Sequence, residues 1–159
     1  MASQGDGDRA IATNRRARYE YEILETLEAG LVLRGTEVKS LRTGQVNFKD
    51  SYATVRNGEI WLLGCHISPY SHGTDANHDP ERDRKLLLHA REITRLAGKI
   101  AERGLTLVPL KLYFKSGRAK LEIGLARGKK LHDKRATLRE REVRREMDKA
   151  ARAFRAQTR

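Results

Sequence analysis

Cysteine is almost absent from this chain, and its scarcity excludes two classes of structure. Cys65 is the only cysteine in 159 residues, so neither an internal disulfide nor a cysteine-based zinc site can form. A reducing cytoplasm is the compartment that suits such a chain. We therefore expect a cytoplasmic protein.

Long hydrophobic runs are also missing. The longest apolar run is 60–65, counting its glycine, and a membrane-spanning helix needs about 18 such residues. The first nine residues contain Asp6 and Asp8 and no apolar stretch, so we expect no secretory signal. The sequence predicts no membrane attachment.

The usual catalytic motifs are lacking as well. No nucleophile elbow, Walker loop or dinucleotide fingerprint is present, and the Gly-rich run 124–128 does not have the spacing of a phosphate-binding loop. His72, Asp75 and His78 share one loop, which leaves a metal-dependent or hydrolytic enzyme as one hypothesis. Since His and Asp are ordinary turn residues, we favour a solvated turn and expect no enzyme activity, metal or cofactor.

Positive charge, in contrast, is abundant and unevenly distributed. Lys and Arg number 33 against 21 Asp and Glu, which gives a net charge of +12. Residues 127–159 hold 13 basic and 5 acidic side chains, a net of +8, and residues 1–126 hold the remaining +4. A folded body with a basic arm indicates a polyanionic partner, for which RNA and a membrane surface are the alternatives.

Hydrophobic periodicity predicts one small, mainly β domain. We expect 1–13 to be disordered, 14–126 to form an antiparallel barrel of the OB type with about two flanking helices, and 127–159 to be a basic C-terminal tail. The tail has only a thin apolar stripe, so its helix would be marginal in water. We expect the tail to be disordered in solution and to become helical on a bound partner.

Local signals place several elements. Alternation predicts a strand from Tyr19 that breaks at Ala29-Gly30, and Thr36 is the expected N-cap of a short helix. Helical spacing over 93–100 predicts a helix that ends at Gly104.

Turn residues predict two hairpins. Asn57-Gly58 pairs Arg56 with Glu59, and a turn at Ser116-Gly117 pairs two strands with one apolar face, although a longer loop is also possible there. In the shorter loop, the expected apolar face holds Val108, Leu110, Leu112, Phe114, Ala119, Leu121, Ile123 and Leu125.

Exposed cations with interleaved aromatic and apolar groups favour RNA binding. The outer face of the second hairpin combines Tyr113 with basic residues, and the clusters at 15–18, 39–42 and 127–130 add further cations. Trp61 is more simply explained by core packing. In the run 86–88, three consecutive leucines cannot all face one core, so at least one should be exposed.

An ordered series of motifs resembles the small protein B family, the SsrA-binding proteins of bacteria. The similarity runs from about residue 14 to residue 135 without evident gaps. Its motifs are 14–18 (NRRAR), 28–30 (EAG), 35–42 (GTEVKSLR), 50–52 (DSY), 84–88 (RKLLL), the strand 107–114, 124–130 (GLARGKK) and 133–135 (DKR).

The resemblance implies a function that composition does not. Members of this family bind the tRNA-like domain of transfer-messenger RNA, mimic the anticodon arm and deliver the RNA, with elongation factor Tu, to stalled ribosomes in trans-translation. Their tails enter the decoding centre and the vacant mRNA channel. A structural RNA-binding protein of the ribosome is the alternative, and we expect a monomer in either case.

The resemblance and the basic patches together identify site residues. The predicted RNA-binding residues are Asn14, Arg15, Arg16, Arg18, Glu28, Lys39, Arg42, Lys85 and Leu87. The predicted ribosome-binding residues of the tail are Lys129, Lys130, His132, Asp133, Lys134 and Arg135.

Overall fold

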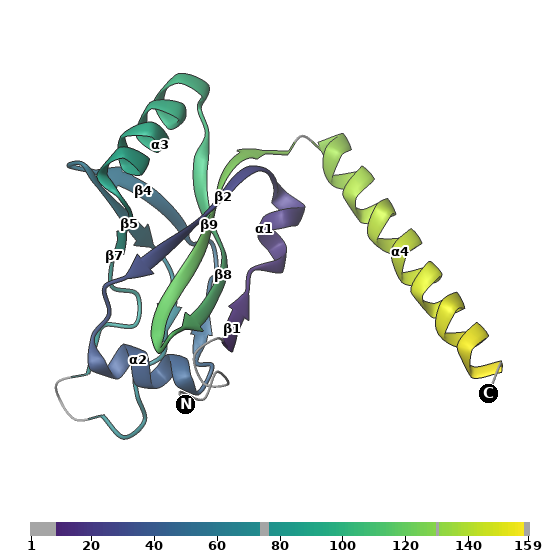
Figure 1. The fold of residues 1–159 in the computed structure, drawn as a ribbon, viewed down its shortest axis with the longest axis horizontal. Helices are drawn as coiled ribbons and strands as arrows, with labels where there is room; N and C mark the ends of the chain where they lie inside the picture. Colours follow the sequence, from purple (N-terminus) through teal and green to yellow (C-terminus); the bar gives the residue numbers. More distant parts are fainter. Residues whose placement is uncertain (1–8, 74–76, 130, 158–159) are drawn as a thin grey trace.

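A closed antiparallel sheet forms the body of the protein. The computed structural model describes residues 9–73, 77–129 and 131–157. Its elements, in chain order, are β1 (Arg9–Thr13), α1 (Arg15–Glu20), β2 (Tyr21–Leu31), α2 (Gly35–Arg42), β3 (Val46–Asn47), β4 (Tyr52–Arg56), β5 (Glu59–Leu63), β6 (His66–Ile67), β7 (Arg84–Leu87), α3 (Ala90–Arg103), β8 (Thr106–Lys115), β9 (Arg118–Gly128) and α4 (Leu131–Gln157) (Figure 1).

The strands close into a ring. A 7-stranded sheet has the order β1-β8-β4-β5-β7-β2-β9, and β8 also pairs with β9. This pairing closes the strands from β8 to β9 into a ring, with β1 added to β8. Leucine and isoleucine side chains from all sides of the ring fill its interior, among them Ile60, Leu86, Leu107 and Ile123. Figure 1 shows α3 at one end of the ring and α2 at the other. The predicted mainly β, antiparallel fold with flanking helices is confirmed.

Both hairpins form as their turn residues predict. Asn57 and Gly58 have φ values of +52° and +73°, and the register pairs Arg56 with Glu59 as expected. Ser116 and Gly117 likewise have positive φ, and Lys115 pairs with Arg118. Short-range turn chemistry therefore sets these two registers.

A bulge in β8 changes which residues face the core. The register shifts between Pro109 and Lys111, so Val108 and Leu110 do not share a face with Leu112 and Phe114 as predicted. They pack instead with Ala17 and Ala126 in a second, smaller apolar cluster. An extra residue in one strand reverses the alternation of its side chains. Val108 and Leu110 therefore form the surface against which α1 packs.

The N-terminal predictions are wrong in three places. The strand expected from Tyr19 begins only at Tyr21, because residues 15–20 form α1, which Asn14 caps by accepting a hydrogen bond from Ala17 N. The strand β2 continues through Ala29-Gly30, since both residues pair with β9. The expected disorder does not extend over residues 9–13, because β1 pairs there with β8; residues 1–8 lie outside the described residues.

The helix α2 begins earlier than predicted, with Arg34 as its N-cap in place of Thr36. Arg34 N donates a hydrogen bond to Glu37 Oε1 over 2.8 Å. The Thr36 hydroxyl lies 2.8 Å from His78 Nδ1, so it is used by a distant loop instead. The predicted helix ending at Gly104 is confirmed as α3.

A fully buried ion pair joins α2 to β7. Arg84 Nε lies 2.5 Å from Glu37 Oε2, and both side chains have an exposed fraction of 0%. Arg82 contacts the second carboxylate oxygen at 2.5 Å, and Arg84 also donates to the carbonyl oxygens of Cys65 and Pro80. Burial tends to raise the pKa of Glu37, but the donors from Arg34, Arg82 and Arg84 outweigh it and lower that pKa.

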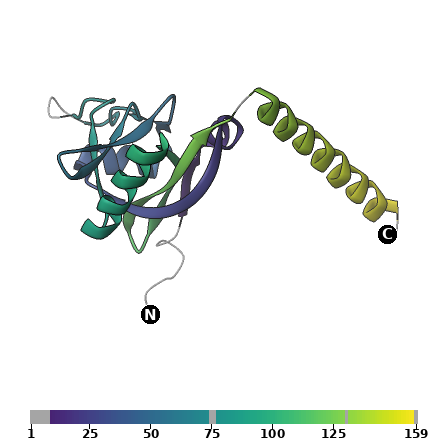
Figure 2. The same ribbon diagram turned by 90° about the horizontal axis from the view of Figure 1, so that it is seen from above.

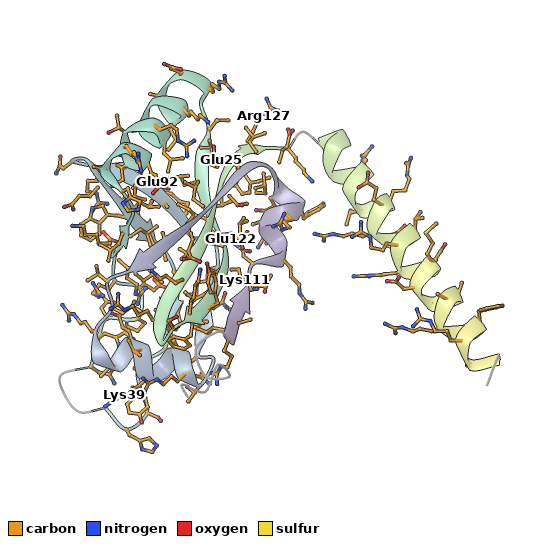
Figure 3. All side chains as sticks on the ribbon, viewed as in Figure 1. Glu25, Lys39, Glu92, Lys111, Glu122 and Arg127 are labelled. Carbon is orange, nitrogen blue, oxygen red and sulfur yellow. The ribbon has the colours of Figure 1, made fainter. Side chains whose placement is uncertain are left out.

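A second ionic cluster holds α3 against β2. Glu25 contacts Arg95 at 2.6 Å and Lys99 at 3.2 Å, and Figure 3 shows Glu25 beside α3. The hydrogen bond from Arg95 lowers the pKa of Glu25 from 4.5 to about 2. The ionised form of Glu25 is therefore the one that stabilises the folded chain.

We expect Glu25→Gln to weaken the acid dependence of stability. The contribution of Glu25 is complete above its unfolded pKa of 4.5 and is lost as the pH falls towards 2. The variant should be less stable by roughly 1 kcal/mol at neutral pH, since the pair is partly exposed, and the difference should vanish near pH 2. Urea unfolding at a series of pH values measures it. A difference that stays constant down to pH 2 would contradict this assignment.

The last element, α4, extends away from the body (Figures 1 and 2). Arg141 Nη2 lies 3.4 Å from Arg15 O, which brings this helix near α1. Large apolar side chains are exposed along α4, namely Leu138, Val143, Met147 and Phe154. In the described part of the chain, no helix is both long and apolar enough to cross a membrane.

Candidate nucleic-acid interface

The outer surface of the sheet brings Glu28 and Leu87 together. Side chains two residues apart on a strand share a face, so Glu28 and Gly30 face the same way on β2. Leu87 lies directly opposite Gly30 on β7 and is 51% exposed. A Cβ atom on Gly30 would lie 3.2 Å from Leu87 Cβ, so this glycine leaves the space that Leu87 covers.

Strands β9 and β8 continue this surface. Lys120 lies opposite Gly30 and Tyr113 lies opposite Lys120, while Glu122 lies opposite both Glu28 and Lys111. Figure 3 shows Lys111 and Glu122 side by side. We name this surface the Glu28 face and define it by Glu28, Leu87, Lys111, Tyr113, Lys115, Lys120 and Glu122.

Tyr113 and Lys115 hold the Glu28 carboxylate. The Tyr113 hydroxyl donates a hydrogen bond to Glu28 Oε2, and Lys115 Nζ lies 3.3 Å from the same oxygen. The Tyr113 hydrogen bond lowers the pKa of Glu28, so its carboxylate is ionised at neutral pH. Burial, together with this bond, raises the pKa of Tyr113, which therefore stays a donor.

This arrangement leaves Glu28 able to accept further hydrogen bonds. A carboxylate has about four acceptor positions, and the shorter contacts of Glu28 are both on Oε2. Phosphate would be repelled by the charge, whereas the amino and imino groups of bases are donors. Glu28 is thus suited to recognising base edges, and the cations around it to holding the backbone.

The Glu28 face also contains the ring of Tyr113 and a hollow beside it. Lys111 Nζ lies 5.8 Å from the centroid of the Tyr113 ring, which is a cation–π distance. A hollow of about 290 Å³ is lined by Glu28 and Tyr113 together with residues of β1, among them Arg9. The hollow places a carboxylate, a ring and cations within reach of one ligand group.

Trp61 also lies on the outside of the sheet. It faces Lys85 across the β5–β7 pairing, and Lys85 shares its face with Leu87. The Arg56 guanidinium lies 5.9 Å from the centroid of the Trp61 ring, and Lys85 Nζ lies 2.9 Å from Glu59. Core packing of Trp61 was therefore the wrong prediction, and its ring lies beside the Glu28 face.

The residues predicted from the N-terminal motif play different parts. Asn14 donates through Nδ2 to Pro109 O over 2.8 Å and accepts from Ala17 N, so its side chain fixes α1 on β8. Arg15, Arg16 and Arg18 are exposed, and Arg18 Nη2 lies 3.9 Å from Glu122 on the Glu28 face. Asn14 thus positions the arginines rather than presenting its amide to solvent.

The remaining predicted cations of the body lie on α2. Lys39 and Arg42 are exposed, and Figure 3 shows Lys39 at the end of the molecule that α2 forms. Lys39 Nζ lies 5.5 Å from the centroid of the Tyr70 ring, and Arg9 donates to Arg42 O over 2.5 Å. These elements form a second group of cations on α2, which Arg9 links to the hollow of the Glu28 face.

The tail residues are described only in part. Lys129 connects the end of β9 to α1, since its N–H donates to Glu20 O over 2.9 Å and its Nζ donates to Arg18 O over 3.0 Å. Arg135 is exposed on α4. Lys130 lies outside the described residues, as do the side chains of His132, Asp133 and Lys134.

His78, one of the three loop residues that suggested an enzyme, is buried and hydrogen-bonded within the fold. His78 is 3% exposed, and its ring nitrogens contact the Thr36 hydroxyl and Ile67 O, both at 2.8 Å. Since Nε2 must donate to a carbonyl oxygen, Nδ1 accepts from Thr36. Asp75 lies outside the described residues. His78 therefore serves the fold, and no group of three metal-ligating side chains occurs among the described residues.

Sequence reasoning missed the contact between Glu28 and Tyr113. The two residues are 85 positions apart, and their contact depends on the pairing of β2 with β9 and of β9 with β8. Tyr113 could be placed on an outward face from its hairpin alone. No local signal marks its partner.

Comparison with known proteins gives consistent matches. A family model described as "SmpB protein" matches residues 11–153. The SsrA-binding protein of Thermosynechococcus vestitus is 60% identical over 147 residues, 92% of this chain and 97% of that protein. The SsrA-binding protein of Carboxydothermus hydrogenoformans is 58% identical over 146 residues, 92% of this chain and 98% of that protein.

A solved structure is similar as well. It is described as "tmRNA-SmpB: a journey to the center of the bacterial ribosome", and its matching chain has 59% sequence identity and a TM-score of 0.64. The match covers 76% of this chain and 85% of that chain.

Proposed function

The chain belongs to the SmpB family, and from that premise we propose that it is a transfer-messenger RNA-binding factor of trans-translation that grips the RNA through the Glu28 face. One observation supports this site above others. The sheet brings together Glu28 and Leu87, two residues far apart in sequence that the family resemblance singles out, on one exposed surface with Tyr113 and Lys120.

The chemistry of this face fits a folded RNA. Tyr113 and Lys115 hold an ionised carboxylate that accepts from base edges, and Leu87 offers apolar surface to a ribose or a base. Lys111, Lys120 and the arginines of α1 supply phosphate contacts, which carry affinity without sequence information. Recognition of bases and attraction of phosphates are thus assigned to different side chains.

The tail is proposed to act on the ribosome rather than on the RNA. A helix that exposes Val143, Met147 and Phe154 gains little from folding alone, so we propose that it orders in the decoding centre and mRNA channel of a stalled ribosome. In this proposal Lys129, Lys130, His132, Asp133, Lys134 and Arg135 make the first contacts there. Delivery with elongation factor Tu, a monomeric state, a cytoplasmic location and the lack of catalysis belong to the same proposal.

We expect Glu28→Ala to weaken binding of the tRNA-like domain by roughly 10- to 100-fold, the effect of losing hydrogen bonds to a charged group. Removing a negative charge would by itself favour RNA, so a loss isolates specific hydrogen bonding. Trp61, the only tryptophan, lies beside this face, and its fluorescence can follow the titration.

Glu22→Ala is the matched control, because Glu22 is an exposed carboxylate on the same strand. It should leave affinity unchanged or slightly raised. Tyr113→Phe should give a smaller loss than Glu28→Ala, since the carboxylate remains but is less well held. Equal affinities for Glu28→Ala and Glu22→Ala would refute the site.

A further inference from the structure

A loop packed against α2 presents two aromatic rings beside a cation. The rings of Tyr70 and His72 lie 5.5 Å apart, nearly edge to face at 71°, and Lys39 Nζ lies 5.5 Å from the Tyr70 centroid. None of these three residues belongs to the Glu28 face. They line or border a hollow of about 460 Å³ on the outside of α2.

Polar side chains hold the described residues around Tyr70 in place. Asn77 accepts a hydrogen bond from Tyr70 N and donates one to Tyr70 O, at 3.2 and 2.9 Å, which closes the loop on itself. Ser40 of α2 donates to Ser68 O over 2.7 Å, and the buried His78 bridges Thr36 and Ile67 O. The contacts of Asn77 fix the backbone of Tyr70, and the contact between the two rings places His72 beside it.

The lining of this hollow differs from that of four other hollows on the described chain. Its residues are Ser40, Thr43, Gln45, Pro69, Tyr70, Ser71 and His72, none of which is acidic. Each of the others includes a carboxylate: Glu59 near α3, Glu140 on α4, Glu20 and Asp50 near α1, and Glu28 on its own face. An anionic ligand therefore meets no repulsion from the lining here.

Size and chemistry indicate the class of ligand. Small-molecule sites have volumes of roughly 300 to 1,000 Å³, and this hollow falls within that range. An aromatic ring stacks on any base, a lysine beside it attracts the phosphate, and Gln45 and Ser71 offer polar atoms to a base edge. Rings fixed in advance lose little conformational entropy when a base stacks on them.

We propose that Tyr70 and His72, with Lys39 at their side, form a stacking site for one unpaired RNA nucleotide. The site lies on α2 and its loop and is a second RNA contact beyond the Glu28 face. The nucleotide could come from the tRNA-like domain or from ribosomal RNA, and both sources present unpaired bases with phosphates. The site is sequence-tolerant, because stacking does not read base edges.

The test compares Tyr70→Ala with Tyr70→Phe in the full chain, using two probes: the isolated tRNA-like domain and purified small ribosomal subunits. Only the side chain of Tyr70 changes, and the loop bonds at its backbone remain. Tyr70→Ala should weaken binding to whichever of the two probes supplies the stacked nucleotide by roughly 5- to 100-fold, the range for loss of one stacked base. Tyr70→Phe should keep wild-type affinity for that probe. Thermal unfolding of each variant checks that the fold is retained.

Two further measurements separate this site from the Glu28 face. Lys39→Gln should reduce the salt dependence of binding by about one phosphate contact, whereas Tyr70→Ala should leave the salt slope unchanged. Ultraviolet cross-linking of the wild-type complex should attach a nucleotide to Tyr70 or His72, and Glu28→Ala at saturating RNA should keep that cross-link. Wild-type affinity of folded Tyr70→Ala for both probes, with no cross-link in 69–72, would overturn the proposal.

Discussion

Removing the residues after Lys129 is expected to abolish ribosome rescue while leaving affinity for the tRNA-like domain within about threefold at 0.15 M salt, where exposed charges act over only about 8 Å. The body remains complete in such a chain. Lys129 joins the end of β9 to α1, through hydrogen bonds to Glu20 O and Arg18 O, and these bonds are kept. The strand β9 runs to Gly128, so a cut at the expected boundary after residue 126 would remove residues that pair with β2.

The physical reason is that most of the net charge lies in the tail, whereas the residues of the Glu28 face lie in the body. The tail carries most of the net +12 but none of the residues of the Glu28 face. Its loss should lower the non-specific, salt-dependent part of RNA affinity and spare the contacts of Glu28 and Leu87. On the ribosome, in contrast, no other described segment offers an extended basic helix.

Rescue is measured as tagging of a peptide on ribosomes stalled at the end of a truncated message. A full-length chain with Val143 and Met147 changed to serine is the control, because it keeps every charge and removes part of the apolar stripe. A large loss in this control would show that the stripe packs on the ribosome. Wild-type tagging by the shortened chain would disprove a role for the tail.

Arg84→Ala is expected to lower the free energy of unfolding by about 3 to 5 kcal/mol, the usual cost of removing one partner of a buried ion pair. The substitution leaves the Glu37 carboxylate at 0% exposure with a single guanidinium and removes the donors to Cys65 O and Pro80 O. These groups connect α2, the residue before β6 and the loop before β7, so the loss should be global rather than local.

Urea unfolding of Arg84→Ala and Arg56→Ala provides the comparison. Arg56 forms an ion pair with Asp83 at 3.3 Å, and both side chains are about half exposed. An exposed pair contributes roughly 0 to 1 kcal/mol, so this control should unfold almost as the original chain does. Similar losses in the two variants would mean that the Glu37–Arg84 pair gives no special stability.

Local signals predicted the parts of the fold that depend on a few adjacent residues. The Asn57-Gly58 and Ser116-Gly117 turns need positive φ at their central positions, and both hairpins formed in the predicted register. Gly104 ends α3 in the left-handed conformation for the same reason. The run 86–88 also behaved as expected, with Leu86 buried and Leu87 exposed.

Long-range pairing overruled local signals elsewhere. Ala29-Gly30 should break a strand, yet both residues pair with β9, and Gly30 also pairs with β7. Val108 and Leu110 should face the main core, yet the bulge in β8 directs them towards α1. Thr36 should cap α2, yet its hydroxyl is hydrogen-bonded to the His78 ring instead.

By itself, the sequence determined the charge of this protein, the excess of that charge in residues 127–159, its two hairpin turns and its family resemblance. Each of these depends on composition or on residues close together along the chain. Only the tertiary structure decided that Glu28, Leu87 and Tyr113 share one surface and that Asn14 and His78 serve the fold. Closing the sheet into a ring joins residues tens of positions apart, and no local pattern encodes which side chains then meet.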